Sequence, residues 1–188
     1  VAKGLQPTAQ WGYWGFPSTR HTNSNWLAQG HTTEPLIRQC RALYPEVYDC
    51  NRGVDRTTHV QQHITSVLKQ AAGRMPVYVF VSPRYCGENK DRSFFIPDDI
   101  FLRQVNAVMR ATWVDENKRQ HRIKGLILWD AYGYTPETEW EDLDLKHKHC
   151  FELLTALTGA WASAMSGKEV ITEPADSGYC INGLPAPM

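Results

Sequence analysis

Apolar residues along the chain alternate between short continuous runs and longer segments with a helical period. The short runs predict strands at residues 10–16, 43–48, 77–81 and 123–129. The periodic segments predict helices at residues 33–41, 55–72, 97–114 and 140–165. Strands that alternate with helices at this spacing favour an α/β fold, in which helices cover a parallel sheet.

Polar segments separate these elements. Residues 18–30 are rich in Ser, Thr, Asn and His and predict a loop, and a second long polar loop follows residue 82. From residue 166 the chain is rich in Gly and Pro. We therefore expect one structural domain over residues 1–165 and an irregular C-terminal tail over residues 166–188.

Four βα units amount to half of a TIM-like (β/α) barrel. The chain has 188 residues, whereas a complete barrel takes roughly 250. An isolated half would leave two parallel edge strands and an apolar sheet face uncovered. We therefore expect another chain, or a second copy of this one, to complete the barrel. A four-stranded doubly wound sheet that stands alone is the alternative.

Charge and hydropathy exclude some classes of partner. The 20 Lys and Arg residues balance the 20 Asp and Glu residues, so no net field would steer the chain to nucleic acid or to an acidic membrane. A polyanionic substrate would need a local basic patch. No apolar run approaches the roughly 20 residues that span a bilayer, and we expect no membrane span.

The chain has five cysteines, an odd number that cannot pair completely within it. Cys50 and Cys86 each follow a predicted strand, so both should lie at the same rim of the sheet, within reach of a disulfide. No C-x-x-C or Cys/His pattern indicates a zinc site, and we expect neither a metal nor a cofactor. Free thiols in an intracellular enzyme remain the alternative.

Aromatic residues are dense where the predicted strands end. These positions form the working edge of a parallel barrel, and ring faces there suit a carbohydrate site. The alternative is that the rings pack the barrel mouth. The candidate residues at this edge are Tyr13, Trp14, Tyr48, Trp129 and Asp130.

Three motifs resemble successive strands of the hyaluronidase family of glycoside hydrolases. They are Trp11-Gly-Tyr-Trp-Gly-Phe-Pro17, Arg41-Ala-Leu-Tyr-Pro-Glu-Val-Tyr48 and Leu126-Ile-Leu-Trp129. The resemblance runs from about Lys3 to Gly159, in order and at the family's spacing. It implies that the chain is the C-terminal half of a hyaluronidase-like barrel.

The resemblance also implies roles for single residues. Tyr48 falls on the family's active-site tyrosine and Trp129 on the tryptophan that lines the acetamido pocket, so these two are the catalytic candidates. Trp14 falls on a tyrosine at the cleavage subsite, where an indole can only donate a hydrogen bond. Tyr13, Trp14 and Asp130 are the substrate-binding candidates.

Family members use substrate-assisted retaining chemistry, in which the N-acetyl oxygen of the sugar attacks the anomeric carbon. Their acid is a glutamate in an Asp-x-Glu pair, which has no counterpart here, and the leaving oxygen needs that proton donor. Asp130 and Asp49 are expected to be hydrogen-bonding loop residues rather than substitutes.

Cys150 resembles the family cysteine of the last helix, whose partner lies near the start of the barrel. It is therefore a candidate for an interchain disulfide with an N-terminal half on a separate chain, formed by proteolysis of one precursor. The pairing of Cys40 and Cys180 stays open. Ser18 stands where the family has the first cysteine of a loop disulfide.

The histidines predict no metal site. His59 and His63 have helical i, i+4 spacing, but a third ligand is not evident. His147 and His149 point to different faces of one helix, and we expect both at the surface.

Two functions are compatible with these observations. The first is a secreted hyaluronidase-like subunit that hydrolyses N-acetylhexosaminide bonds in hyaluronan or chondroitin, with the acid glutamate on the other chain. The second is a catalytically inactive sugar-binding, storage or structural subunit with the same fold.

Overall fold

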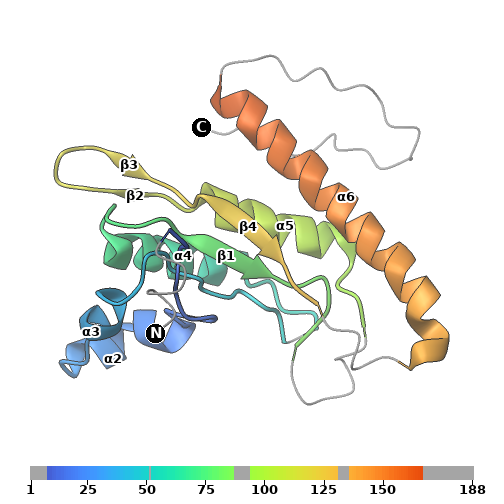
Figure 1. Ribbon diagram of the computed structural model, residues 1–188, viewed down its shortest axis with the longest axis horizontal. Coiled ribbons are helices and arrows are strands. Elements are labelled where there is room, and N and C mark those ends of the chain that lie inside the picture. Colours follow the sequence, from blue (N-terminus) through green and yellow to red (C-terminus); the bar gives the residue numbers. More distant parts are fainter. Residues whose placement is uncertain (1–7, 51, 87–93, 131–135, 167–188) are drawn as a thin grey trace.

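A small parallel sheet lies at the centre of the molecule (Figure 1). The computed structural model describes residues 8–50, 52–86, 94–130 and 136–166. Strands β1 (Tyr78–Val81) and β4 (Gly125–Leu128) pair in parallel, with Val79 opposite Leu126. Their residues come from two separate βα units, as the alternating pattern predicts. The fold is α/β with a parallel sheet.

Two more segments extend the sheet on the β1 side, one beside the other, through isolated bridges rather than as regular strands. Leu43 and Glu46 bridge to Val77 and Phe80, and residues 14 and 16 both bridge to Tyr44. The strands predicted at residues 10–16 and 43–48 are therefore wrong as regular strands, although their place beside the sheet is as expected. Pro45 accepts a bond from the Phe80 N–H at 2.9 Å but has no N–H to donate, which interrupts the ladder.

Two helices cover one face of the sheet, α4 (Thr57–Ala71) and α5 (Asp98–Arg110). The apolar core between these helices and the sheet follows from the two-residue period of the strand and the helical period of α4 and α5. Its buried members include Val77, Val79, Val81, Ile64, Val67, Phe101, Val105 and Val108.

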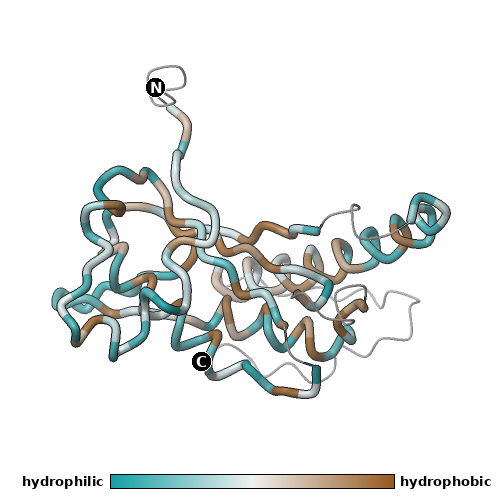
Figure 2. Tube along the Cα trace, turned by 90° about the horizontal axis from the view of Figure 1, so that it is seen from below, coloured by the Kyte–Doolittle hydropathy of each residue, from teal (hydrophilic) through white to brown (hydrophobic). Residues whose placement is uncertain are grey.

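Helix α6 (Trp140–Met165) follows a short turn, η4 (Glu137–Glu139), and has the bounds that the pattern predicts. Its buried face includes Cys150, Leu154 and Trp161. Figure 2 shows hydrophobic and hydrophilic residues alternating along the helical turns. Within the described part of the chain, no helix is both long and apolar enough to cross a bilayer. The predicted tail lies outside the described residues, except for Ser166.

The predicted loop over residues 18–30 contains helical turns instead, so that expectation was wrong. They are η1 (Thr19–Thr22) and α2 (Ser24–Ala28), followed by α3 (Glu34–Ile37). The side chain of Asn23 accepts bonds from the N–H groups of Asn25 and Trp26, at 2.8 and 3.4 Å. A polar residue that reads as a loop former therefore acts here as a helix cap.

The helix predicted through residue 114 was also wrong, because α5 ends at Arg110. A hairpin follows, with β2 (Trp113–Val114) antiparallel to β3 (Gln120–His121). The Trp113 ring stacks on that of His121 at 4.9 Å. Aromatic and β-branched residues favour such cross-strand pairs.

The second face of the sheet carries aromatic rings. Tyr44 stacks on Tyr78 at 5.8 Å and lies 6.3 Å from Phe80, whose ring meets that of Trp129 at 6.5 Å. We call these four residues the aromatic face. Tyr78 and Phe80 point away from the buried valines because successive side chains of a strand alternate. A Cβ on Gly12 would meet the Tyr44 ring at 2.6 Å, so only glycine fits beside it.

Candidate functional site

Trp14 and Tyr48 meet at the edge of the sheet. The Trp14 Nε1–H donates to the Tyr48 hydroxyl at 3.3 Å, and the two ring centroids lie 6.2 Å apart. The Trp14 side chain is exposed, whereas Tyr48 is half-buried. Tyr13, also exposed, packs edge-on against Phe16 at 6.3 Å. The bridges to Tyr44 thus place the two predicted site residues Trp14 and Tyr48 side by side.

The environment of Tyr48 keeps its phenol neutral. Burial raises the pKa of Tyr48 to about 12, and the negative charges of Glu46 and Asp130 act in the same direction. The hydrogen bond from Trp14 opposes these effects. A neutral phenol whose oxygen already accepts a bond from Trp14 still has its O–H to donate. Tyr48 can therefore donate a hydrogen bond to the carbonyl oxygen of a ligand.

Trp129 lies at the carboxyl end of β4. Its backbone N–H donates to the Val81 carbonyl at 2.9 Å, which continues the pairing of β1 with β4 by one residue. The Trp129 side chain is 51% exposed while its ring touches Phe80. Trp129 therefore combines a fixed backbone with a ring that a ligand can reach.

Asp130 follows Trp129, but basic residues engage both of its oxygens. Arg84 donates to Oδ1 from Nε at 2.8 Å and from a terminal nitrogen at 2.6 Å. The His147 Nε2 contacts Oδ2. The carboxylate is nearly buried, with 11% of its side chain exposed. The structure therefore places Asp130 inside an ion-pair cluster, and the expected surface position of His147 was wrong.

The sequence assigned no role to two residues of this edge, Glu46 and Arg84. The Glu46 carboxylate accepts from the Tyr48 N–H at 3.2 Å. Its spacing of two from both Tyr44 and Tyr48 could have placed it on the same face. Arg84 follows β1 at a strand end, but no local signal pairs it with a residue 46 positions away.

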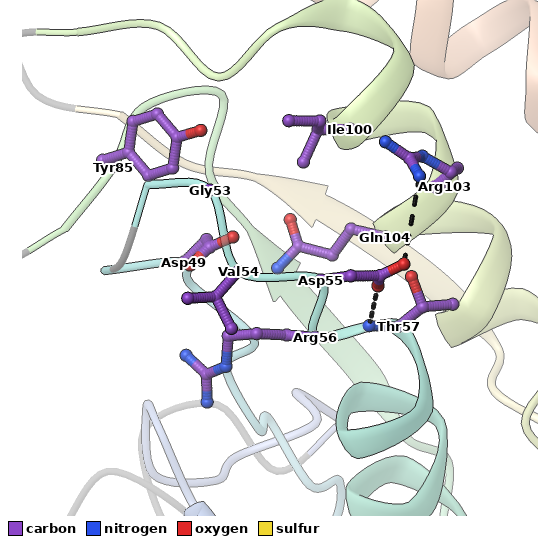
Figure 3. A pocket seen from close by; sticks show the side chains of 10 residues that line it. All are labelled: Asp49, Gly53, Val54, Asp55, Arg56, Thr57, Tyr85, Ile100, Arg103 and Gln104. Carbon is purple, nitrogen blue, oxygen red and sulfur yellow. Dashed lines mark hydrogen bonds and ion pairs between the residues drawn. The ribbon is translucent and has the colours of Figure 1, made fainter.

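A small cavity of about 140 Å³ lies beside this edge, between the segment after Tyr48 and helix α5 (Figure 3). Its lining includes Asp49, Tyr85 and Gln104, all buried. The Gln104 side-chain N–H donates to the Val47 carbonyl. Neither Tyr48 nor Trp129 lines the cavity, so it is separate from the predicted site.

The disulfide expected between Cys50 and Cys86 is confirmed, with the Cα atoms 4.4 Å apart. Cys40 and Cys150 are both buried. Burial raises the pKa of Cys150 to about 11, and the carboxylates of Asp98 and Asp130 add to this effect. Cys180 lies outside the described residues.

The two histidines of α4 have different surroundings. His63 is buried, and its Nδ1 lies 2.8 Å from the Thr22 hydroxyl, whereas His59 is exposed. Among residues 8–50, 52–86, 94–130 and 136–166, no three His, Cys, Asp or Glu side chains are grouped to hold a metal ion.

The observed class is thus an α/β protein with aromatic and charged side chains at the carboxyl edge of a small parallel sheet. A comparison with protein-family models finds no match for the chain, and a search of curated proteins finds no similar sequence. The resemblance to hyaluronidases therefore rests on the three sequence motifs.

Proposed function

We propose that the chain is a subunit of a hyaluronidase-like protein that binds N-acetylhexosamine units of hyaluronan or chondroitin at the carboxyl edge of its sheet. The observation that carries the proposal is the hydrogen bond from Trp14 to Tyr48. This bond joins two of the three motifs at one place. Trp129, from the third motif, belongs to the aromatic face beside them. These are the residues for which the resemblance implies sugar contacts.

The chemistry of the edge suits an acetamido sugar. The exposed rings of Trp14 and Trp129 offer flat surfaces to the apolar faces of pyranose rings. The neutral Tyr48 hydroxyl can donate to the N-acetyl carbonyl oxygen, the atom that the family's chemistry uses as nucleophile. A donor there orients the acetamido group toward the anomeric carbon.

Hydrolysis would proceed by the family's substrate-assisted route. The N-acetyl oxygen forms a bond to the anomeric carbon as the glycosidic C–O bond breaks, and the leaving oxygen takes a proton from a glutamic acid. Water then opens the cyclic intermediate with retention of configuration. Asp130 is not proposed as that acid because Arg84 and His147 engage its carboxylate. We assign the acid to an Asp-x-Glu pair on a second polypeptide.

A catalytically inactive sugar-binding subunit is the second candidate. Trp14 favours it, because its indole donates to the oxygen of Tyr48 where the resemblance leads us to expect a phenol. Both candidates require sugar binding, but only the first requires depolymerisation of hyaluronan or chondroitin by the native assembled protein. Chain cleavage with retained anomeric configuration would support the enzyme, and binding without cleavage would support the inactive subunit.

We also propose a second polypeptide that covers Tyr44, Tyr78 and Phe80 of the aromatic face, leaves Trp129 open to the sugar, and completes the barrel. The half-buried rings of Tyr44, Tyr78 and Phe80 lie opposite the face that α4 and α5 cover. An uncovered apolar sheet face of this kind favours association. The Cys50–Cys86 disulfide is consistent with secretion, since such bonds persist in oxidising compartments.

Electrophoresis of the native protein tests the partner. We expect a larger band under non-reducing conditions, from which reduction releases this chain and a second polypeptide linked through Cys150. Because Cys150 is 95% buried, that bond would have to form while the two parts fold together. A single band of unchanged mass, together with a monomeric mass in solution, would contradict the second polypeptide.

Affinity for a hyaluronan hexasaccharide tests the binding site. In the native assembled protein we expect Trp129→Ala to weaken binding about tenfold or more, because a central aromatic contact is lost. Tyr48→Phe should weaken it less, since only one hydroxyl is removed. Trp113→Phe, in the β2–β3 hairpin, is the matched control and should bind as the wild type does. Equal affinities for all four proteins, measured calorimetrically, would contradict the proposed site.

A further inference from the structure

An open groove of about 480 Å³ lies between the helical turns η1 and α2 and the first turn of α4. The described residues that line it are Thr19, Arg20, Asn23, Trp26, Gln29 and His59. They combine an indole ring with basic and amide side chains, and none of them carries a carboxylate. This composition favours an anionic ligand that also presents a ring.

The walls of the groove are fixed by contacts outside it. Gln70 of α4 donates to the His21 carbonyl at 3.0 Å, which ties η1 to α4. The Trp26 ring packs edge-on against His21 at 5.3 Å and stacks on His31 at 5.2 Å. Both the turn and the indole are therefore in place before a ligand arrives, which reduces the entropy lost on binding.

Positive charge gathers around the groove. His63 lies beneath η1, where its Nδ1 is 2.8 Å from the Thr22 hydroxyl. Burial lowers the pKa of His63 to about 4, and the positive charges of His59, Arg56 and His21 lower it further. The chain as a whole has no net charge, so a polyanion needs a local basic patch of this kind.

The polar side chains of the lining have donors to offer. In the part of the chain that the structure describes, no hydrogen bond or ion pair engages the Arg20 guanidinium or the His59 ring, and both are exposed. The Asn23 Oδ1 caps α2, which leaves its amide N–H groups to donate. A guanidinium presents a planar fork that matches the two oxygens of a carboxylate.

We propose that this groove binds an acidic sugar, a uronate unit of hyaluronan or chondroitin, with its carboxylate on Arg20 and its ring beside Trp26. The choice of sugar chain rests on the proposed function, and the groove adds a subsite outside the carboxyl edge of the sheet. Ring contacts connect the two places. Phe16 lies 6.3 Å from Tyr13 and 5.4 Å from His21, which in turn contacts Trp26. Because N-acetylhexosamine and uronate alternate in these chains, one chain has a unit for each place.

Two forms of one ligand test the subsite. They are a hyaluronan hexasaccharide and the same hexasaccharide with its uronates reduced to neutral sugars, which keeps the N-acetyl groups. In the native assembled protein we expect the acidic form to bind about tenfold more tightly, because charge-assisted hydrogen bonds are strong. Arg20→Gln should lose most of this preference, and Arg20→Lys should keep part of it. Lys69→Gln removes an exposed charge of α4 outside the groove; it is the matched control and should retain the preference.

The indole N–H resonance of Trp26, assigned with Trp26→Phe in the nitrogen-15-labelled protein, provides a second measurement. We expect the acidic hexasaccharide to shift it in the wild type and in Lys69→Gln, and much less in Arg20→Gln. The same preference in Arg20→Gln as in the wild type, or a Trp26 resonance unchanged throughout the titration, would overturn the proposal. A hexaglutamate peptide offers carboxylates without sugar rings, and binding of this peptide at Trp26 as tightly as the hexasaccharide would also overturn it.

The subsite and the proposed function can fail separately. If the hexasaccharide shifted the resonances of Trp14 and Trp129 but not that of Trp26, the sugar site at the sheet edge would stand and the subsite would fail. If it shifted Trp26 through Arg20 and left the other two unchanged, the groove would bind the acidic sugar and the proposed function would fail.

Discussion

Replacing Cys50 and Cys86 together by serine is expected to lower the free energy of unfolding by about 4 kcal/mol. The two residues are separated by 36 positions in the sequence, and closing a loop of that length removes this much chain entropy from the unfolded state. The measurement is the free energy of unfolding from urea denaturation of the wild type and the double variant.

Two comparisons make the disulfide prediction specific. Cys40→Ser changes another buried cysteine, whose Sγ donates to the Leu36 carbonyl at 3.3 Å, so it reports the cost of placing a serine hydroxyl at a buried cysteine position. Because the disulfide begins two residues after Tyr48, the double variant should also weaken binding of the hexasaccharide. A loss of less than about 1 kcal/mol in the double variant would contradict a stabilising role for the bond.

Acid is expected to destabilise the fold through His63. Burial lowers the pKa of His63 to about 4, and the positive charges of His59, Arg56 and His21 lower it further. Because the folded-state pKa lies below the unfolded value of 6.5, the unfolded chain binds the proton first as the pH falls. The contribution of His63 is fully present above about pH 6.5 and is lost progressively down to about pH 4, at a cost of about 3 kcal/mol.

The free energy of unfolding measured across this range of pH checks the effect. His63→Leu removes the titrating ring and should flatten the dependence between about pH 6.5 and about pH 4, whatever its own stability. His59→Gln, on an exposed turn of the same helix, should leave most of the slope in place. The same slope in His63→Leu and in the wild type would assign the acid sensitivity to other groups.

Helices were predicted from the sequence more accurately than strands. Helix α6 has the expected bounds because its apolar residues keep a helical period over 26 residues. Pro45 lies inside an apolar run that otherwise indicates a strand, and its missing N–H reduces the segment to bridges. The β2–β3 hairpin was hidden because Trp113 and Val114 directly follow a helical pattern.

The candidate site, too, could be predicted from the sequence only in part. The Cys50–Cys86 bond could be predicted because residues that follow parallel strands share one edge. The cluster of Arg84, Asp130 and His147 could not, because its members are 46 and 17 positions apart. The sequence marked Asp130 as a candidate at a strand end but gave no sign of its two partners. Charged pairs between distant elements depend on tertiary packing, which no local pattern encodes.

Trp14, Tyr48 and Trp129 are proposed to form one sugar site. Titration of the native assembled protein with a hyaluronan hexasaccharide, followed through its indole N–H resonances, tests this directly. We expect the resonances of Trp14 and Trp129 to shift together with one dissociation constant, while those of Trp113 and Trp161 stay unchanged. Saturable shifts confined to Trp113 or Trp161, or no shift of any resonance, would contradict the claim.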